Sequence, residues 1–341
     1  MWASILLDVM AKKVVVLGGG TGTYAVLSGL KNYPLDITAI VTMADSGGSA
    51  RKERDEFGML PVSDVRKALL ALSPEDGDGG FLRDLFNYRF SEGIGVEGTT
   101  FGNLFLVALT NTLGSQEKAI EEAARILQVK GQVLPVALEE TNLVAEYDEG
   151  VTVVGEHGID EPQHDGRLAI RRVYLLPQVK ANPKALEAIK EADAIIIGPG
   201  DLYTSLLPTL LVGGIAEAVR ESKAFKFFIL NLMSRYGQTH GFTASRHTAV
   251  LEEHLQTPFT HVLVNTAELP LEVIQYYATT ENSFPIENDL REERYQLVRG
   301  DFLSDRTFRP EPGDKLKRSL LRHDPEKLSQ ALMEVLERKE G

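Results

Sequence analysis

The sequence predicts a doubly wound α/β protein with a mostly parallel sheet, a β-rich insertion and a C-terminal helix. Apolar runs typical of buried strands alternate with segments of helical periodicity along the 341 residues. Glycine-rich or small polar turns follow four predicted strands, at 18–23, 45–49, 198–205 and 231–237. Because open parallel sheets bind ligands outside the carboxyl ends of their strands, these turns predict one shared ligand site.

The first predicted strand runs directly into a cluster of glycines. Val14–Leu17 is continuously apolar, and Tyr24, Leu27 and Leu30 then repeat at helical spacing; between them lie Gly18, Gly19, Gly20, Thr21, Gly22 and Thr23. A strand, a glycine loop and a helix together offer free backbone N–H groups to a phosphate. The alternative is a tight turn without a ligand, but such a turn needs only one or two glycines. Four glycines in five positions favour close approach by a ligand.

The first half of the chain continues with a second strand and a group of helices. The strand spans 35–42, helices are predicted at 64–72, 81–88, 102–111 and 116–129, and 77–80 is predicted to be a loop. Short strands at 132–138, 143–147, 151–154 and 168–176 make up the insertion, which we place at about 131–180. Residues 1–12 are expected to be an N-terminal extension, and 13–341 a single nucleotide-binding domain.

The second half returns to alternating helices and strands. Asn182-Pro183 is a typical helix start, and strands are predicted at 194–197, 225–232 and 261–265, with helices at 212–222, 244–255 and 271–278. The segment 283–320 is charged, contains proline and has no clear period, which predicts an irregular arm. Asp324 and Pro325 then begin the final helix, whose stripe runs from Leu328 to Leu336.

Composition excludes several kinds of protein. With 36 basic and 49 acidic residues the net charge is −13, which opposes non-specific binding to nucleic acid or an anionic membrane. The chain has no cysteine, so disulfides and thiolate catalysis are excluded. The seven histidines show no zinc spacing, and His247 and His254 are expected on a surface helix. We therefore expect a cytoplasmic protein without a zinc site and without nucleic-acid or membrane partners.

The turn after the second strand offers several ligand-binding groups. Asp45, Ser46, Gly47 and Gly48 combine a carboxylate, a hydroxyl and unhindered amides directly after Thr42. Asp45 can hold a ribose hydroxyl, a magnesium ion or a substrate hydroxyl, or it can form an Asx-turn or cap a helix. Arg66 follows nearby and suits bidentate phosphate contact, unless it is a solvated surface charge.

Two further segments carry candidate binding residues. Asn103 begins an apolar helix, where its amide can contact a ligand or bond locally. A second anion cradle, or else a plain turn, is predicted from Gly198, Pro199, Gly200, Tyr203, Thr204 and Ser205. Asn231 and Met233 follow another strand and are expected to close the pocket.

These motifs, in this order, resemble the CofD/YvcK superfamily. The resemblance rests on Gly18–Gly22, Thr42–Ser49, Phe86–Phe90, Phe101–Leu104 and Gly198–Ser205, and it covers roughly residues 13 to 335. It implies a Rossmann-like core, in agreement with the alternation of strands and helices. Asn231-Leu232-Met233 and the closing His323–Leu328 resemble the YvcK branch, whose members are called gluconeogenesis factors.

The resemblance implies two functions. YvcK proteins bind UDP-sugars such as UDP-N-acetylglucosamine and are linked to cell shape and wall synthesis on gluconeogenic carbon. CofD proteins are magnesium-dependent 2-phospho-L-lactate transferases of deazaflavin coenzyme synthesis, in which Asp45 would be the candidate catalytic or metal-binding residue. We expect the UDP-sugar-binding function, no obligatory cofactor, and a homo-oligomer, most simply a dimer.

The chain also departs from the family pattern. Ala50–Arg54 replaces a Ser-Gly-Arg-Leu-Arg segment, Val62-Ser63-Asp64 replaces Pro-Gly-Asp, and Met233–Thr239 replaces Met-Thr-Gln-Pro-Gly-Glu-Thr. A histidine usual before Phe101 is Thr99 or Thr100. The elements expected at the phosphates are retained, while those nearer the sugar or acceptor differ.

Overall fold

A computed structural model describes residues 11–44, 60–75, 77–93, 95–305 and 319–338. Its centre is a seven-stranded sheet in the order β10-β9-β8-β7-β1-β2-β3, in which every neighbouring pair is parallel. The strands are β1 (Lys12–Gly18), β2 (Leu35–Val41), β3 (Gln132–Pro135), β7 (Ala194–Ile197), β8 (Phe225–Ile229), β9 (His261–Asn265) and β10 (Gln296–Gly300). This confirms the predicted parallel α/β class.

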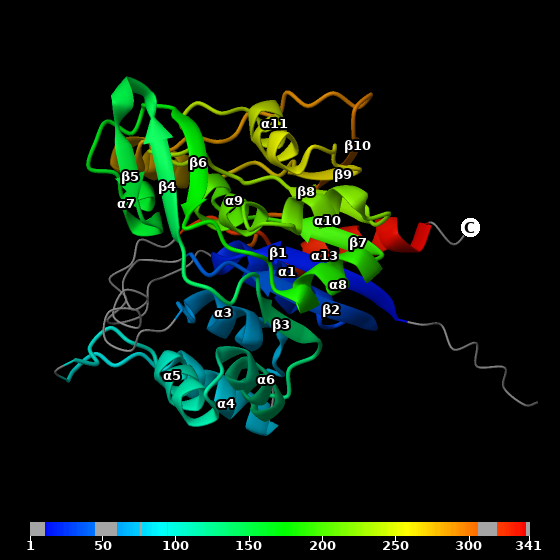
Figure 1. Cartoon of the computed structure of the whole chain (residues 1–341). Coiled ribbons are helices and arrows are strands. Elements are labelled where there is room, and N and C mark those ends of the chain that lie inside the picture. The colour runs from blue at the N-terminus through cyan, green and yellow to red at the C-terminus, as the bar shows by residue number, and fades with distance from the viewer. Residues whose placement is uncertain (1–10, 45–59, 76, 94, 306–318, 339–341) are drawn as a thin grey trace, which may run out of the picture.

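Helices connect the strands and pack in two groups, as a doubly wound sheet requires (Figure 1). α1 packs against α3 and α13, whereas α10 packs against α8 and α11. The helices are α1 (Gly20–Leu30), α3 (Ser63–Leu72), α4 (Gly77–Asn87), α5 (Phe101–Leu113), α6 (Gln116–Ile126), α7 (Glu156–Asp160), α8 (Pro183–Glu191), α9 (Leu207–Leu210), α10 (Ile215–Glu221), α11 (Ala244–Leu255), α12 (Leu271–Tyr276) and α13 (Pro325–Glu337). Short turns of other helix types occupy η1 (Asp148–Gly150), η2 (Leu202–Leu206) and η3 (Tyr277–Glu281).

The central strands are apolar because they are covered on both faces. Val14–Leu17 of β1 and Ala194–Ile197 of β7 are at most 2% exposed, which explains why their sequences show no polar alternation. The two strands lie side by side in parallel register, with Val14 opposite Ala194 and Leu17 opposite Ile197. The loops that follow them therefore leave the sheet at the same edge.

The predicted insertion is a second, antiparallel sheet. Its order is β5-β4-β6, with β4 (Asn142–Tyr147), β5 (Thr152–Val154) and β6 (Ile170–Leu176), and Figure 1 shows it beside the central sheet. The strand predicted at 132–138 is β3, and it pairs with β2 in the central sheet rather than with the insertion. The antiparallel unit accordingly begins at Asn142.

Three local predictions were wrong. Gly77–Gly80 is the first turn of α4, where Gly80 lies so close to the Glu75 carbonyl that a Cβ would meet it at 2.5 Å. The edge strand β10 lies within the predicted irregular arm. Its sequence is half-buried and charged, and so it did not indicate a strand. His247 is 1% exposed, because α11 turns it toward the core rather than to the surface. None of the helices in the described part of the chain is long and apolar enough to cross a membrane.

Candidate functional site

A cavity of about 540 Å³ lies where the strand order reverses, between β1 and β7. In doubly wound sheets this reversal opens a crevice at the carboxyl ends of the strands. The cavity brings together most of the predicted binding residues, namely Gly19, Gly20, Thr21, Gly22, Thr42, Arg66, Asn103, Pro199, Gly200, Thr204, Ser205, Asn231 and Met233. Three of the four predicted polar turns thus meet at one place.

The first glycine loop presents the N-terminus of α1 to this cavity. Gly19 is the N-cap in an extended conformation, no side chain caps it, and the first turn holds no acidic residue. Gly20 has φ +70°, and a Cβ there would have only Ser205 Oγ near it, at 3.8 Å. The helix start is therefore open at Gly20, where the helix dipole favours an anionic group, while the Asp64 carboxylate lies beside the N-cap Gly19.

The other glycines of this loop are required by contacts within the chain. A Cβ at Gly22 would overlap the Pro199 carbonyl, and one at Gly19 would overlap the Asp64 carboxylate. Gly18 has φ +147°, a conformation that L side chains rarely adopt. The glycine cluster was predicted to leave space for a ligand, and it also leaves space for the second loop and for α3. Of its four glycines, only Gly20 faces open space.

The second loop is held by the strand end beside it. The Asn231 amide donates to the Gly200 carbonyl at 2.8 Å, and its Oδ1 accepts from the Gly200 N–H at 3.1 Å. Asn231 therefore shapes the loop as well as lining the cavity. Tyr203 is buried, packs edge-to-face on Phe242, and has its pKa raised to about 12 by burial. Gly198, whose φ is +82°, does not line the cavity, and neither do Tyr203 and Gly18.

Helices α3 and α5 form a polar wall, to which α3 contributes Arg66 and Lys67. Arg66 Nε donates to Asn103 Oδ1 at 2.9 Å, and Arg66 Nη1 donates to Asn87 Oδ1 at 2.9 Å. Lys67 Nζ lies 2.8 Å from the Asp64 carboxylate, one turn earlier on the same helix. Arg66 and Asn103, two of the predicted binding residues, are thus fixed by each other at the cavity.

The antiparallel insertion supplies a wall that the sequence did not predict. Asp160 of α7 accepts from Arg235 at 2.8 Å and from Gln238 at 3.1 Å, and Gln238 accepts from Thr204 at 3.3 Å. Burial lowers the pKa of Arg235, but the carboxylates of Asp201 and Asp160 outweigh it and hold that pKa above its usual range. Asp160, Asp201 and Arg235 all line the cavity.

The segment before α13 closes the remaining side. Tyr277, Ser319, Leu321, Arg322 and His323 line the cavity, and the Tyr277 hydroxyl accepts from the Leu320 N–H at 2.7 Å. Burial lowers the pKa of His323 to about 4, so the ring is neutral at pH 7. Its Nε2 has no hydrogen-bond partner within the described parts of the chain.

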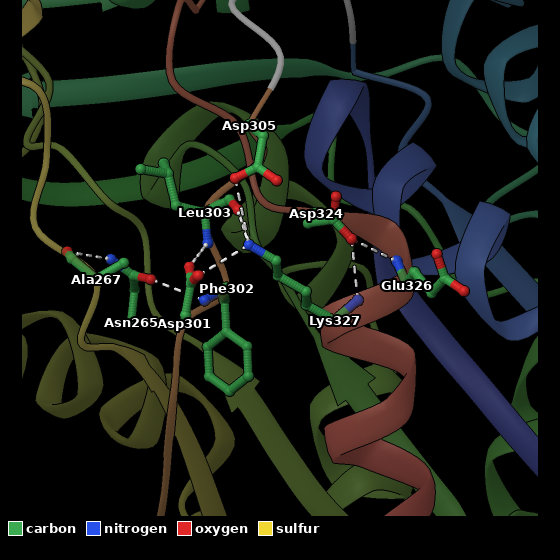
Figure 2. A network of polar contacts seen from close by, with 9 residues as sticks. All are labelled: Asn265, Ala267, Asp301, Phe302, Leu303, Asp305, Asp324, Glu326 and Lys327. Carbon is green, nitrogen blue, oxygen red and sulfur yellow. Dashed lines mark hydrogen bonds and ion pairs between the residues drawn. The ribbon is translucent and has the colours of Figure 1, made fainter.

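A polar network fixes this segment (Figure 2). Lys327 of α13 donates to the Asp301 carboxylate and to the Leu303 carbonyl, both at 2.9 Å. The Asn265 side chain, at the end of β9, accepts from the Phe302 N–H at 2.9 Å. The network joins the edge of the sheet to the start of α13, and so it holds the cavity-lining residues just before Asp324.

Four of the predicted residues, Asp45, Ser46, Gly47 and Gly48, lie outside the described residues. Residues that the prediction missed come mainly from three places: α3 with the turn before α5, the insertion, and the segment before α13. They include Asp64, Lys67, Arg89, Thr99, Thr100, Glu156, His157, Asp160, Asp201, Arg235, Tyr277, Ser319, Arg322 and His323. Among these residues, only Asp64 and His323 carried a signal that could be read from the sequence, because each lies close to the start of a helix.

The site was also tested for magnesium, which the resemblance implies. Over the described ranges, no group of three or more His, Asp or Glu side chains is close enough to hold a metal ion. The described residues thus provide no complete ligand set of the oxygen-rich kind that magnesium prefers. Asp45 is the proposed additional ligand and is not among them.

Comparison with known proteins agrees with this architecture. The family model described as 2-phospho-L-lactate transferase CofD matches residues 14–303. A gluconeogenesis factor of Bacillus subtilis is 38% identical over 95% of this chain and 98% of its own length. Another, from Listeria innocua, is 39% identical over 96% of both chains.

A solved structure shows the same fold over nearly the whole chain. The crystal structure of a Bacillus halodurans protein matches with a TM-score of 0.85 and 38% identity, covering 95% of this chain and 99% of that one. The match includes both the central sheet and the insertion, since so little of either chain is left out. The chain belongs to the CofD family, and within it to the branch of the gluconeogenesis factors.

Proposed function

We propose that this protein binds a UDP-sugar, such as UDP-N-acetylglucosamine, in the cavity between β1 and β7. The observation that carries the proposal is the open N-terminus of α1 at Gly20, facing a cavity of about 540 Å³. Ligand sites of small molecules commonly enclose about 300–1,000 Å³. The proposal includes a cytoplasmic, dimeric regulator linked to cell shape and wall precursor metabolism on gluconeogenic carbon.

The diphosphate is assigned to the first loop. The N–H groups of Gly20, Thr21 and Gly22 belong to the first turn of α1, whose helix dipole favours negative charge. Arg66 stands on the adjoining wall and adds positive charge, and Lys67 beside it is paired with the Asp64 carboxylate. Hydroxyls of Thr42, Thr204 and Ser205 are available for the rest of the ligand.

A thermal-shift panel tests this proposal. UDP-N-acetylglucosamine and UDP-glucose should raise the melting temperature, because a ligand that binds only the folded state stabilises it by mass action. GTP, GDP and NAD should have little effect. Stabilisation by guanine nucleotides with magnesium, and none by UDP-sugars, would refute the proposal.

A matched pair of variants locates the site. Gly20→Ala should abolish most of the UDP-sugar shift, because the methyl group enters the space assigned to phosphate. Gly241→Ala is the control: its φ is +72° against +70° for Gly20, it has no neighbour within 4 Å, and it does not line the cavity. Equal binding by both variants would remove Gly20 from the site.

A second candidate is a magnesium-dependent phospholactyl transferase, which the description of the matching family model favours. Asp45 would then contribute to metal or acceptor binding. The same panel separates the two candidates, since the transferase should respond to guanine nucleotides only when magnesium is present. Sedimentation of the purified protein tests the proposed dimer directly.

A further inference from the structure

The second loop carries a carboxylate at the cavity. Asp201 lies between Gly200 and Thr204, both of which line the cavity, and it is itself a half-buried lining residue. The sequence predicted an anion cradle here, yet a carboxylate repels the phosphate that such a cradle would hold. Asp201 therefore points to a different ligand group at this loop.

The Asp201 carboxylate has no partner in the described part of the chain. It precedes η2 without making a side-chain cap, and it forms neither a hydrogen bond nor an ion pair within 4.0 Å there. Its neighbour Asp160 is the opposite case, because Arg235 and Gln238 occupy its two oxygens. Of these two acids, only Asp201 has both carboxylate oxygens without a partner in the described part of the chain.

The surroundings of Asp201 make an unpartnered carboxylate unfavourable there. Burial raises the pKa of Asp201, and Asp160 raises it further, while the Arg235 guanidinium opposes both. An acid held in an unfavourable setting beside a cavity is typical of a functional group. Arg235 donates to Asp160 at 2.8 Å, so its guanidinium is bound to the neighbouring acid rather than to Asp201.

We propose that Asp201 recognises a hydroxyl group of the bound nucleoside-diphosphate sugar, so that the first loop holds phosphate and the second loop holds a hydroxyl. This rests on the proposed function. An ionised carboxylate only accepts hydrogen bonds, and hydroxyls are the most numerous donors that such a ligand offers. Both the ribose and the sugar carry hydroxyls, so the chemistry is shared and the experiment separates the two sources.

Titration calorimetry with UDP-N-acetylglucosamine and with UDP tests the assignment. Asp201→Asn and Asp201→Ala should weaken binding about 10- to 100-fold, the effect expected for a lost hydrogen bond to a charged group. Asp36→Asn is the matched control, since it removes the same charge from an exposed position near the amino end of β2. Loss with both probes assigns the nucleoside part of the ligand, and loss with the UDP-sugar alone assigns the sugar.

The melting temperature without ligand separates recognition from a structural role. Because burial and the neighbouring Asp160 both disfavour the charged form of Asp201, Asp201→Asn should not lower that temperature. Unchanged affinity of both variants, or a loss of affinity matched by a loss of stability, overturns the inference. If the native chain binds neither probe, the proposed function itself has failed, and this outcome is distinct from the others.

Discussion

At the scale of single residues, the glycines of the first loop do different work. Gly20 leaves space at the N-terminus of α1, while Gly22 lets α1 touch the backbone of the second loop at Pro199. The contact at Gly22 sets the distance between the two loops, and therefore the width of the cavity they share. The two positions should respond differently to the same added methyl group.

Gly22→Ala should lower the free energy of unfolding by about 3 kcal/mol, because the obstructing atom is a backbone carbonyl that cannot swing away. Denaturant titration measures this. Gly241→Ala adds a methyl group in open space and should cost about 1 kcal/mol from its positive φ alone. Equal costs at the two positions would show that the loops separate freely.

Buried histidines predict how stability depends on pH. Burial lowers the pKa of His247 to about 4, while the unfolded chain titrates near its ordinary value of 6.5. Between these values the unfolded state binds more protons, so stability should fall as the pH falls from 6.5 to 4, by about 3 kcal/mol from this residue. His247→Asn should make that part of the curve shallower; an unchanged slope in denaturation at several pH values would contradict the assignment.

At the scale of elements, α13 connects the edge of the sheet to the cavity. Asp324 caps it by accepting from the N–H groups of Glu326 at 2.9 Å and Lys327 at 3.0 Å. Lys327 then joins the helix to Asp301 and Leu303 (Figure 2). The cavity residues Leu321, Arg322 and His323 directly precede this cap, so their placement depends on it.

Asp324→Ala should cost about 1 kcal/mol of stability, the usual effect of losing an N-cap. It should also reduce the thermal shift caused by UDP-N-acetylglucosamine, because the wall formed by residues 321–323 loses its anchor. Asp324→Asn is the control, since asparagine caps a helix equally well. A full ligand shift in Asp324→Ala would mean that this wall does not contact the ligand.

At the scale of the whole molecule, the negative net charge destabilises the compact folded state. Because the net charge is −13, the excess acidic side chains repel one another in the folded state, and salt screens this repulsion. Raising sodium chloride from about 0.05 M to about 0.5 M should therefore increase the melting temperature without ligand. Asp36→Lys changes the net charge from −13 to −11 and should respond less. A melting temperature that falls with salt would indicate that ion pairs outweigh net repulsion.

Much of the fold was predictable because its signals are local. Apolar runs, continuous in β1 and β7 and interrupted in β2, β8 and β9, predicted these strands. The capping residues Asn182 and Asp324 predicted the starts of α8 and α13. β10 was missed because an edge strand covered on few sides needs no apolar run. The segment 77–80 was misjudged because Gly79 and Gly80 serve close packing against Pro74 and Glu75 rather than a loop.

The sequence by itself determined the parallel α/β class, the family, and the two loops that meet between β1 and β7. Each of those loops comes directly after a strand of the parallel sheet, and the fold fixes the order of these strands in space. The loop motifs were therefore enough to predict that the two loops meet. Only the tertiary structure decided the other walls, because Asp160, Arg235 and His323 come from segments whose approach depends on packing between distant parts of the chain. It also separated Gly20, which is open to a ligand, from Gly22, which is closed by Pro199. Both positions are glycine in the sequence, and only the neighbours that folding brings distinguish them.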